Sequence, residues 1–213
     1  MKKFSLLFIL FLFFSCSQNV NEILSTSNTV IFDYNQEALK PSSRLSVFIK
    51  SSGDVRRFKE LRIYSAQENY EWVTQNLVMY DSGNGMFAGY SNFIVPVGET
   101  IPEGAYQATF VSADDEECIA TFTIDYDEKI NTFTKEQADA FFTQMNAEQW
   151  VLIYDENDKV IFFGQKTDDV KTQNDIWLNY RSSQYFYDIW LTQDRSLMCI
   201  MPKQQIKRGD TDD

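Results

Sequence analysis

Residues 44–50 read RLSVFIK, and within them Leu45, Val47 and Ile49 recur at every second position. Successive side chains of a β-strand point to opposite faces, so this spacing predicts a strand with one buried face. The same period of two dominates the sequence from residue 29 to residue 127. Seven or eight short strands at this spacing predict an antiparallel β-sandwich made of two sheets.

Turn residues separate the predicted strands. Residues 81–85 read DSGNG, which is the clearest turn signal of the chain, and residues 51–54 read SSGD. We therefore place a first, mainly β domain at residues 29–128. Its strands are expected at residues 30–32, 44–50, 61–64, 70–73, 77–80, 86–95, 105–113 and 118–126.

One short motif sharpens this prediction. Residues 101–106 read IPEGAY, and the pattern Gly104-x-Tyr106 resembles the entry to the sixth strand of immunoglobulin-like and fibronectin-like domains. In those domains the tyrosine forms a corner in which its hydroxyl bonds back to nearby backbone. The resemblance implies that Tyr106 has this role. Ala108 stands where antibody domains place their second Cys, so their disulfide between the two sheets is absent.

The region after residue 128 mixes helix and strand signals. Thr134 and Gln137 fit a capping box at the start of a helix. The apolar stripe of this helix consists of Ala138, Phe141, Phe142 and Met145. A β-hairpin is expected at residues 149–154 and 159–164. Residues 167–174 form either a short helix or a loop. Three further strands are expected at residues 175–180, 184–191 and 196–201. These elements predict a small α+β domain at residues 129–202 and a disordered tail at residues 203–213.

The first sixteen residues have the pattern of an export signal. Lys2 and Lys3 precede an apolar run at residues 4–14, which is shorter than the roughly 20 residues of a transmembrane helix. Residues 13–16 read FFSC and resemble the lipobox of bacterial lipoproteins, where the Cys is lipidated and the preceding peptide is removed. The resemblance implies a signal peptide at residues 1–15 and fatty acylation of Cys16, and we expect a flexible tether at residues 16–28.

The same resemblance implies a location in the cell envelope, with the membrane as a partner through the lipid. Ser17 follows Cys16 in place of the Asp that retains some bacterial lipoproteins at the inner membrane. This favours the outer membrane over the inner membrane. The alternative is an ordinary secreted protein in which Cys16 merely lies near the cleavage site.

Composition limits the chemistry that the chain can perform. The formal net charge is −12, and an acidic surface repels phosphate backbones, so we expect no nucleic-acid partner. Histidine is absent, which excludes Ser-His-Asp and Cys-His catalysis and His-ligated zinc. A catalytic pair of carboxylates and Ca²⁺ bound by oxygens remain open. We predict no cofactor and no metal.

Several smaller features permit two interpretations. Cys118 and Cys199 form either a disulfide or two buried thiols. The acidic runs at residues 114–117 and 155–158 could hold Ca²⁺, but charge runs are usually solvated, so we interpret both as turns. The triplet Arg208-Gly209-Asp210 matches a sequence that integrins recognise, and such short matches arise by chance.

Aromatic residues concentrate in two of the predicted C-terminal strands. Alternation along residues 184–191 places Tyr185 and Tyr187 on one side, and Phe186 and Trp190 on the other. A small domain needs one side for its core, so the other side is available for sugars or for a partner protein. We predict that the binding residues are Trp177, Tyr180, Phe186 and Trp190.

These observations together favour a membrane-anchored envelope lipoprotein that acts as a binding or adaptor module without catalysis. Its partners would be envelope proteins or glycans. One alternative is a structural subunit of an envelope complex, which would expose a large apolar patch. The other is a glycan-acting enzyme, which would carry two carboxylates about 5 to 9.5 Å apart.

Overall fold

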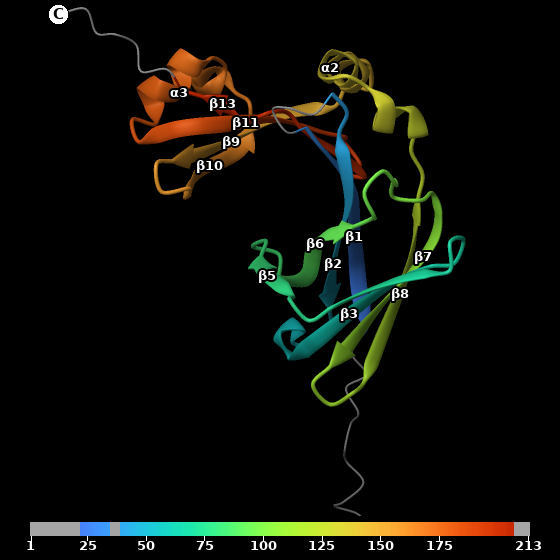
Figure 1. Ribbon diagram of the computed structural model, residues 1–213. Helices are drawn as coiled ribbons and strands as arrows, with labels where there is room; N and C mark the ends of the chain where they lie inside the picture. The colour runs from blue at the N-terminus through green and yellow to red at the C-terminus, as the bar shows by residue number, and fades with distance from the viewer. Residues whose placement is uncertain (1–21, 35–38, 207–213) are drawn as a thin grey trace, which may run out of the picture.

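The computed structural model describes residues 22–34 and 39–206 and shows a mainly β protein built on two sheets (Figure 1). The predicted signal peptide, the lipidation site Cys16 and the triplet Arg208-Gly209-Asp210 lie outside the described residues. Within those two ranges, no helix combines the length and the apolar character that crossing a bilayer requires.

The first eight strands lie where the alternation predicts them. Their bounds are β1 (Ile23–Asp33), β2 (Ser42–Ser51), β3 (Phe58–Ser65), β4 (Tyr70–Thr74), β5 (Val78–Asp81), β6 (Met86–Ile94), β7 (Gly104–Ser112) and β8 (Glu117–Ile124). One sheet contains β1, β2, β6 and β5 in that order, and the other contains β4, β3, β7 and β8. A single 3-10 turn, η2 (Val55–Arg57), lies between β2 and β3, where the chain passes from one sheet to the other.

The main apolar core lies between these two sheets. Leu45, Val47 and Ile49 of β2 are fully buried, as their spacing predicts. They belong to the same apolar cluster as Leu61 of β3 and Phe110 of β7, which come from the facing sheet. Burial of one such side chain contributes about 1.5–3 kcal/mol, so this core is a main source of stability for the paired sheets.

The rest of the described chain forms five strands and four short helices. The strands are β9 (Glu148–Asp155), β10 (Val160–Gln165), β11 (Ser183–Leu191), β12 (Leu197–Ile200) and β13 (Gln204–Gln205). The helices are η3 (Glu128–Thr132), α2 (Lys135–Gln144), η4 (Asp168–Val170) and α3 (Gln173–Asn179). The predicted hairpin is confirmed by the pairing of β9 with β10 around the turn at residues 156–159.

These C-terminal strands extend the first sheet. Strand β12 pairs in parallel with β1, from Val30 opposite Leu197 to Asp33 opposite Ile200. The full order is β10-β9-β11-β12-β1-β2-β6-β5, with β13 on β11, which gives a sheet of nine strands. The hydroxyl of Thr29 also donates to the carbonyl of Arg195 at 2.8 Å. One continuous sheet therefore runs through both of the regions that the sequence analysis separates.

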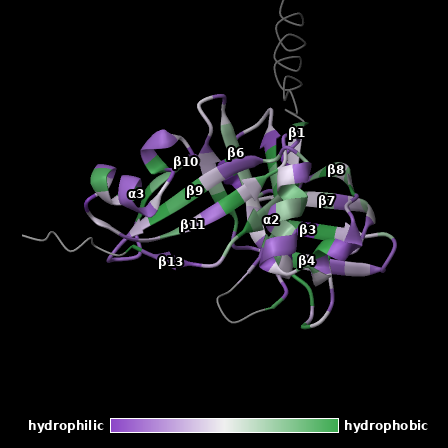
Figure 2. Cartoon of the chain, turned by 90° about the horizontal axis from the view of Figure 1, so that it is seen from above, coloured by the Kyte–Doolittle hydropathy of each residue, from purple (hydrophilic) through white to green (hydrophobic). Residues whose placement is uncertain are grey.

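The two longer helices pack on different cores and lie apart in Figure 2. Helix α2 has the predicted capping box between Thr134 and Gln137, and it buries Ala138 and Phe142 in the main core. Helix α3 contributes Ile176 to a second, smaller core. The buried members of that core are Val151, Ile153, Val170, Ile176, Phe186 and Ile206.

The strand expected at residues 175–180 is wrong, because α3 occupies this segment. The side chain of Thr172 accepts a hydrogen bond from the backbone of Asp175, and the side chain of Asp175 accepts one from the backbone of Thr172. This reciprocal capping fixes a helical start, and the helix then buries Ile176. Local capping and burial outweigh the β propensity of the aromatic residues here.

The structure also differs from the expected tether and tail. Strand β1 begins at Ile23, and the backbone N–H of Ser52 donates to the carbonyl of Glu22 at 2.8 Å. At the other end, β13 pairs with β11, and Ile206 is buried. Polar side chains do not prevent either pairing, because the backbone supplies the hydrogen bonds and the side chains face solvent.

Candidate functional site

The nine-stranded sheet has two faces with different surroundings. The face that carries Phe32, Leu45 and Cys199 packs into the main core, and Ile153 and Phe186 of the same face pack into the smaller core. We call this the covered face. Neither core, as far as the structure describes the chain, includes a side chain from the opposite face, which we call the open face.

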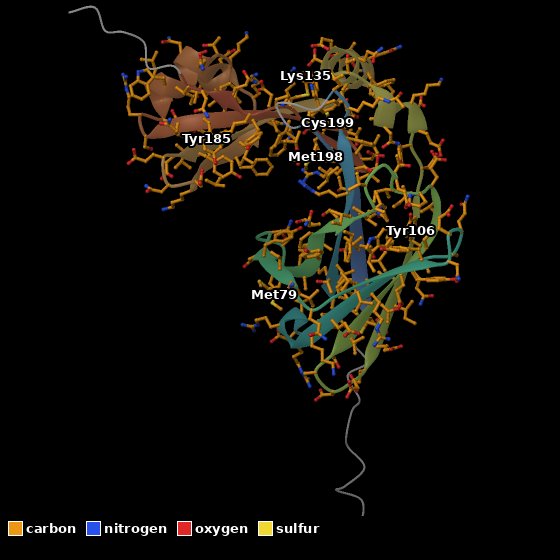
Figure 3. All side chains as sticks on the ribbon, in the orientation of Figure 1. Met79, Tyr106, Lys135, Tyr185, Met198 and Cys199 are labelled. Atoms are coloured by element: carbon orange, nitrogen blue, oxygen red, sulfur yellow. The ribbon has the colours of Figure 1, made fainter. Side chains whose placement is uncertain are left out.

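The open face is rich in aromatic and apolar side chains. Strand register places residues that lie opposite one another on the same face, for example Leu152 with Tyr187 and with Phe163. Figure 3 labels Tyr185 and Met198 of this face, and Cys199 of the covered face. The aromatic and apolar residues of the open face are Ile31, Phe48, Tyr80, Phe87, Trp150, Leu152, Tyr154, Phe163, Tyr185, Tyr187, Ile189, Leu191, Met198 and Ile200. Four of them, Ile31, Tyr185, Ile189 and Leu191, are buried.

Aromatic rings form contacts at both ends of the open face. On the C-terminal strands, Trp150 lies 5.3 Å from Phe163 between ring centroids, and Tyr154 stacks on Tyr185 at 4.9 Å. On β2, β5 and β6, Tyr80 stacks on Phe87 at 5.2 Å and meets the edge of Phe48 at 5.3 Å. Offset and edge-to-face pairs of this kind hold each ring in place. The face therefore presents rings of defined orientation.

Arg195 lies between these two aromatic groups. It belongs to the turn between β11 and β12, and its guanidinium lies 6.0 Å from the centroid of the Trp150 ring. Burial raises the pKa of Tyr80, and the nearby charge of Arg195 offsets part of that rise. Arg195 therefore adds a cation that both ends of the open face can share.

The polar edge of Trp150 is already satisfied. Its indole N–H donates to Glu148 Oε2 at 3.0 Å. This bond, together with one from Gln165 and the charge of Arg195, lowers the pKa of Glu148. The indole is fixed by its own strand, so its ring is available for packing. Phe163 beside it is 52% exposed, and Tyr80 at the other end is 42% exposed.

Two of the four predicted binding residues lie on the covered face. Phe186 is buried in the smaller core, and Trp190 is buried in the main core, where its indole donates to Asp139 Oδ1 at 3.1 Å. Trp177 and Tyr180 pack against the smaller core from α3 and from the residue that ends it. The structure thus brings Trp177, Tyr180 and Phe186 to one core, and it places Trp190 in another.

The period of two separates the two faces of β11, but it does not indicate which of them is the covered face. Tyr185 and Tyr187, on the side that was assigned to the core, belong to the open face. Trp150 and Phe163 were placed in the hairpin without a role. The signal that could have found them is their alternation with the apolar residues Val151 and Phe162, because it puts the exposed rings of both hairpin strands on one side.

The two acidic runs lie in turns, as interpreted from the sequence. In the turn between β7 and β8, Asp114 pairs with Arg57 and Asp115 pairs with Lys59. In the turn between β9 and β10, Asp158 accepts a hydrogen bond from the hydroxyl of Tyr185 at 2.7 Å. In residues 22–34 and 39–206, no group of three or more Asp, Glu, Cys or His side chains is placed to hold a metal ion.

The two cysteines of the described chain are buried thiols in strands of different sheets, Cys118 in β8 and Cys199 in β12. Burial raises the pKa of Cys199 to about 12, and the charges of Asp33 and Asp139 add to this rise. Burial also raises the pKa of Cys118. Because the thiolate is the nucleophile, neither sulfur is suited to catalysis near neutral pH.

Comparisons of this chain with family models, with curated proteins and with solved structures gave no match.

Proposed function

We propose that this chain is a binding module of the cell envelope, anchored through lipid on Cys16, and that it acts by presenting the open face to a partner protein. The observation that carries this proposal is the set of ordered aromatic rings outside both apolar cores, of which Phe163 and Tyr80 are exposed and Trp150, Tyr154 and Tyr187 are partly exposed. Soluble proteins rarely expose such rings together unless the surface has a binding role.

The composition of the open face supports a protein partner rather than a glycan. Aromatic residues, Met and Arg are enriched at the centres of protein interfaces, whereas Lys, Glu and Asp are depleted there. The open face combines Trp150, Phe163 and Tyr80 with Met198 and with Arg195, which lies near rings of both groups. The same register also places Lys50 and the ion pair of Asp33 with Arg44 on this face. Aliphatic residues such as Leu152 and Ile200 lie among the rings. A surface of this kind gains affinity by apolar burial, which a hydroxyl-rich glycan offers less of.

We also propose a fold for each of the two regions on either side of residue 128. An immunoglobulin-like sandwich at residues 29–128 is supported by the order β1-β2-β6-β5, which matches the strand order A-B-E-D, and by β3, β7 and β8, which match C, F and G. A small α+β domain at residues 129–202 is supported by its separate core around Ile176. The shared pairing of β1 with β12 would then hold the two units in a fixed arrangement.

The binding role is tested by a photo-crosslinking amino acid at Phe163, introduced into the full-length protein in living cells. Ile119 on β8 is the matched control, because it is equally exposed at 55% but lies on the other sheet. We expect a discrete protein adduct from position 163 and none from position 119. The double variant Phe163→Ala/Tyr80→Ala, probed from a third position, Leu152, should lose the same adduct. Adducts with glycan alone, or equal adducts from positions 163 and 119, would refute the proposal.

The anchor is tested separately by metabolic labelling with a palmitate analogue. The full-length protein should carry the label and sediment with outer membranes, because several acyl chains are needed for stable anchoring. The Cys16→Ser variant should lose the label and leave the membrane fraction. Label that persists in this variant would show that the lipid, if any, lies elsewhere.

A further inference from the structure

A second surface, separate from the open face, lies beside the tyrosine corner. An open pocket of about 560 Å³ is lined by β4, by the turn before it, by the loop from β6 to β7 and by the start of η3. We call it the corner pocket. The lining residues that matter for its chemistry are Glu68, Tyr70, Trp72, Glu99, Glu103 and Glu128.

The aromatic wall of the corner pocket is held rigidly. Trp72 is only 8% exposed, and its indole N–H donates to the carbonyl of Ile94 at 2.6 Å. Tyr70 meets this indole edge-on at 4.7 Å between ring centroids, and Tyr106 lies nearly parallel to it at 6.4 Å. Tyr70 is 42% exposed, so its ring reaches the solvent side of the pocket. The wall is thus formed before any ligand binds.

The loop that closes the corner pocket is also fixed. The hydroxyl of Tyr106 donates to the carbonyl of Pro102 at 2.7 Å, and the hydroxyl of Tyr126 donates to the carbonyl of Ile101 at 2.5 Å. Gly104 has φ +120°, and a Cβ there would come within 2.4 Å of the side-chain oxygen of Gln67, which lines the pocket. The two hydrogen bonds attach Ile101 and Pro102, and with them the adjacent Glu103, to Tyr126 and to β7.

The carboxylates around the corner pocket lack compensating charge. Glu68, Glu99, Glu103 and Glu128 form no ion pair with any residue that the structure describes, and no Lys or Arg lines the pocket. The acidic turn after β7 differs, since Arg57, Lys59 and Arg62 pair with it. Across the described ranges, no group of three or more Asp, Glu, Cys or His side chains, these glutamates included, is placed to hold a metal ion.

We infer that the corner pocket binds an organic cation, namely an ammonium or guanidinium group. A cation near the face of an aromatic ring is attracted by the ring quadrupole, and desolvation strengthens that attraction. Carboxylates that line the pocket can accept charge-assisted hydrogen bonds from the N–H groups of the same cation. The exposed phenol ring of Tyr70, held in place by the buried indole of Trp72, lines one pocket together with uncompensated carboxylates and so meets these requirements. The cation can be the side chain of a lysine or arginine in a peptide, or a free amine.

The experiment titrates full-length protein in detergent by calorimetry with four small probes. Two are blocked lysine and blocked arginine, which mimic a peptide; the third is cadaverine, a free amine; the fourth is blocked Nε-acetyl-lysine, which is neutral. We expect saturable binding of one cation per chain, and roughly tenfold weaker binding or none for the neutral probe. Tighter binding of the blocked amino acids than of cadaverine would identify a peptide as the source, and the reverse would identify a free amine.

Matched variants separate the corner pocket from general attraction to an acidic protein. Glu68→Gln/Glu103→Gln should weaken cation binding roughly tenfold, and Tyr70→Ala should weaken it as well. The control Glu156→Gln/Asp169→Asn removes the same charge at two exposed sites of the C-terminal region, which contributes no lining residue to the pocket, and should leave binding unchanged. Binding of no cationic probe, or equal losses in pocket and control variants, would overturn the inference. The open face plays no part in this test, so its outcome is independent of the proposed partner.

Discussion

Three buried tyrosines use their hydroxyl groups in the same way. Tyr34, Tyr106 and Tyr126 each donate to a backbone carbonyl, those of Phe133, Pro102 and Ile101 respectively. Each bond attaches a connecting segment to the main core. The ring supplies apolar burial while the hydroxyl satisfies a loop carbonyl that would otherwise lack a partner.

Substitution of Tyr106 by Phe should cost about 1–3 kcal/mol of unfolding free energy, because it removes the donor and leaves the Pro102 carbonyl partly buried and unsatisfied. Urea denaturation measures the loss. The matched control is Tyr64→Phe, because the hydroxyl of Tyr64 donates at 3.0 Å to an exposed side-chain oxygen of Asn69. That variant should lose less than about 0.5 kcal/mol. Equal losses would contradict a special role for the corner.

At this scale the sequence was informative. The pattern Gly104-x-Tyr106 predicts the corner, and the structure confirms the bond from the Tyr106 hydroxyl to nearby backbone. The equivalent bond of Tyr34 could not be predicted, because its partner Phe133 lies 99 residues away and no local pattern links them. A hydrogen bond between residues that are close in sequence can be predicted from a local motif, whereas a bond between distant residues can be identified only from the completed fold.

At the scale of elements, capping decides where the helices begin. Both α2 and α3 are preceded by a threonine cap whose side chain accepts a hydrogen bond from the backbone N–H of the third helical residue. The side chain of that third residue in turn accepts one from the backbone N–H of the threonine. The pair Thr134 and Gln137 was recognised in the sequence. The pair Thr172 and Asp175 has the same spacing and was overlooked in favour of the aromatic residues that follow it, which led to a strand where α3 lies.

Replacement of Thr134 by Ala should destabilise the protein by about 1 kcal/mol, since the backbone N–H of Gln137 in the first turn of α2 loses its acceptor. Thr134→Ser keeps a hydroxyl at the same position and should retain most of the stability. Urea denaturation of both variants, with helix content followed by circular dichroism, checks this. A Ser variant as unstable as the Ala variant would indicate that the methyl group, not the cap, matters.

The period of two predicts where the strands lie, but it does not always predict which face of a strand packs against the core. The apolar residues at 45, 47 and 49 were expected on one face, and they are fully buried. For β11 the same period gave two faces that are both apolar. When both faces of a central strand are apolar, the period of two cannot show which face packs against the core. That ambiguity is why Phe186 and Trp190, rather than Tyr187, were assigned to binding.

For the molecule as a whole, one continuous sheet contains strands from both sides of the boundary predicted near residue 128. Helix α2 lies after that boundary but packs in the main core, and β12 pairs with β1. A parallel pair between strands so far apart leaves no mark in local composition. It forms because the exposed edge of β1 and the exposed edge of β12 each need hydrogen-bonding partners.

Stability of the whole protein should fall as the pH rises above about 10. Burial raises the pKa of Tyr34 and Tyr126, and raises that of Tyr106 to about 12. An unfolded tyrosine ionises near pH 10. The folded state holds these protons longer, so its advantage is complete below pH 10 and is lost as the pH rises towards the folded pKa values.

Tyrosinate absorbance and circular dichroism, recorded together from pH 8 to pH 13, test this expectation. A first group of tyrosines should ionise without loss of structure, and a second group, which includes the buried donors, should ionise only as the fold is lost. In Tyr106→Phe the second group should be smaller by one tyrosine. Complete ionisation near pH 10 with the fold intact would contradict the buried donor roles.

The pairing of β1 with β12 has a consequence for the order of assembly. The strand nearest the amino terminus meets its parallel neighbour only after nearly the entire polypeptide has emerged, since Thr29 bonds to a residue 166 positions later. Until then one side of β1 is unsatisfied and open to incorrect partners. Formation of such a remote contact is slow. Completion of the large sheet is therefore expected to be the last event of folding, and a nascent or truncated chain would be most vulnerable to aggregation along β1.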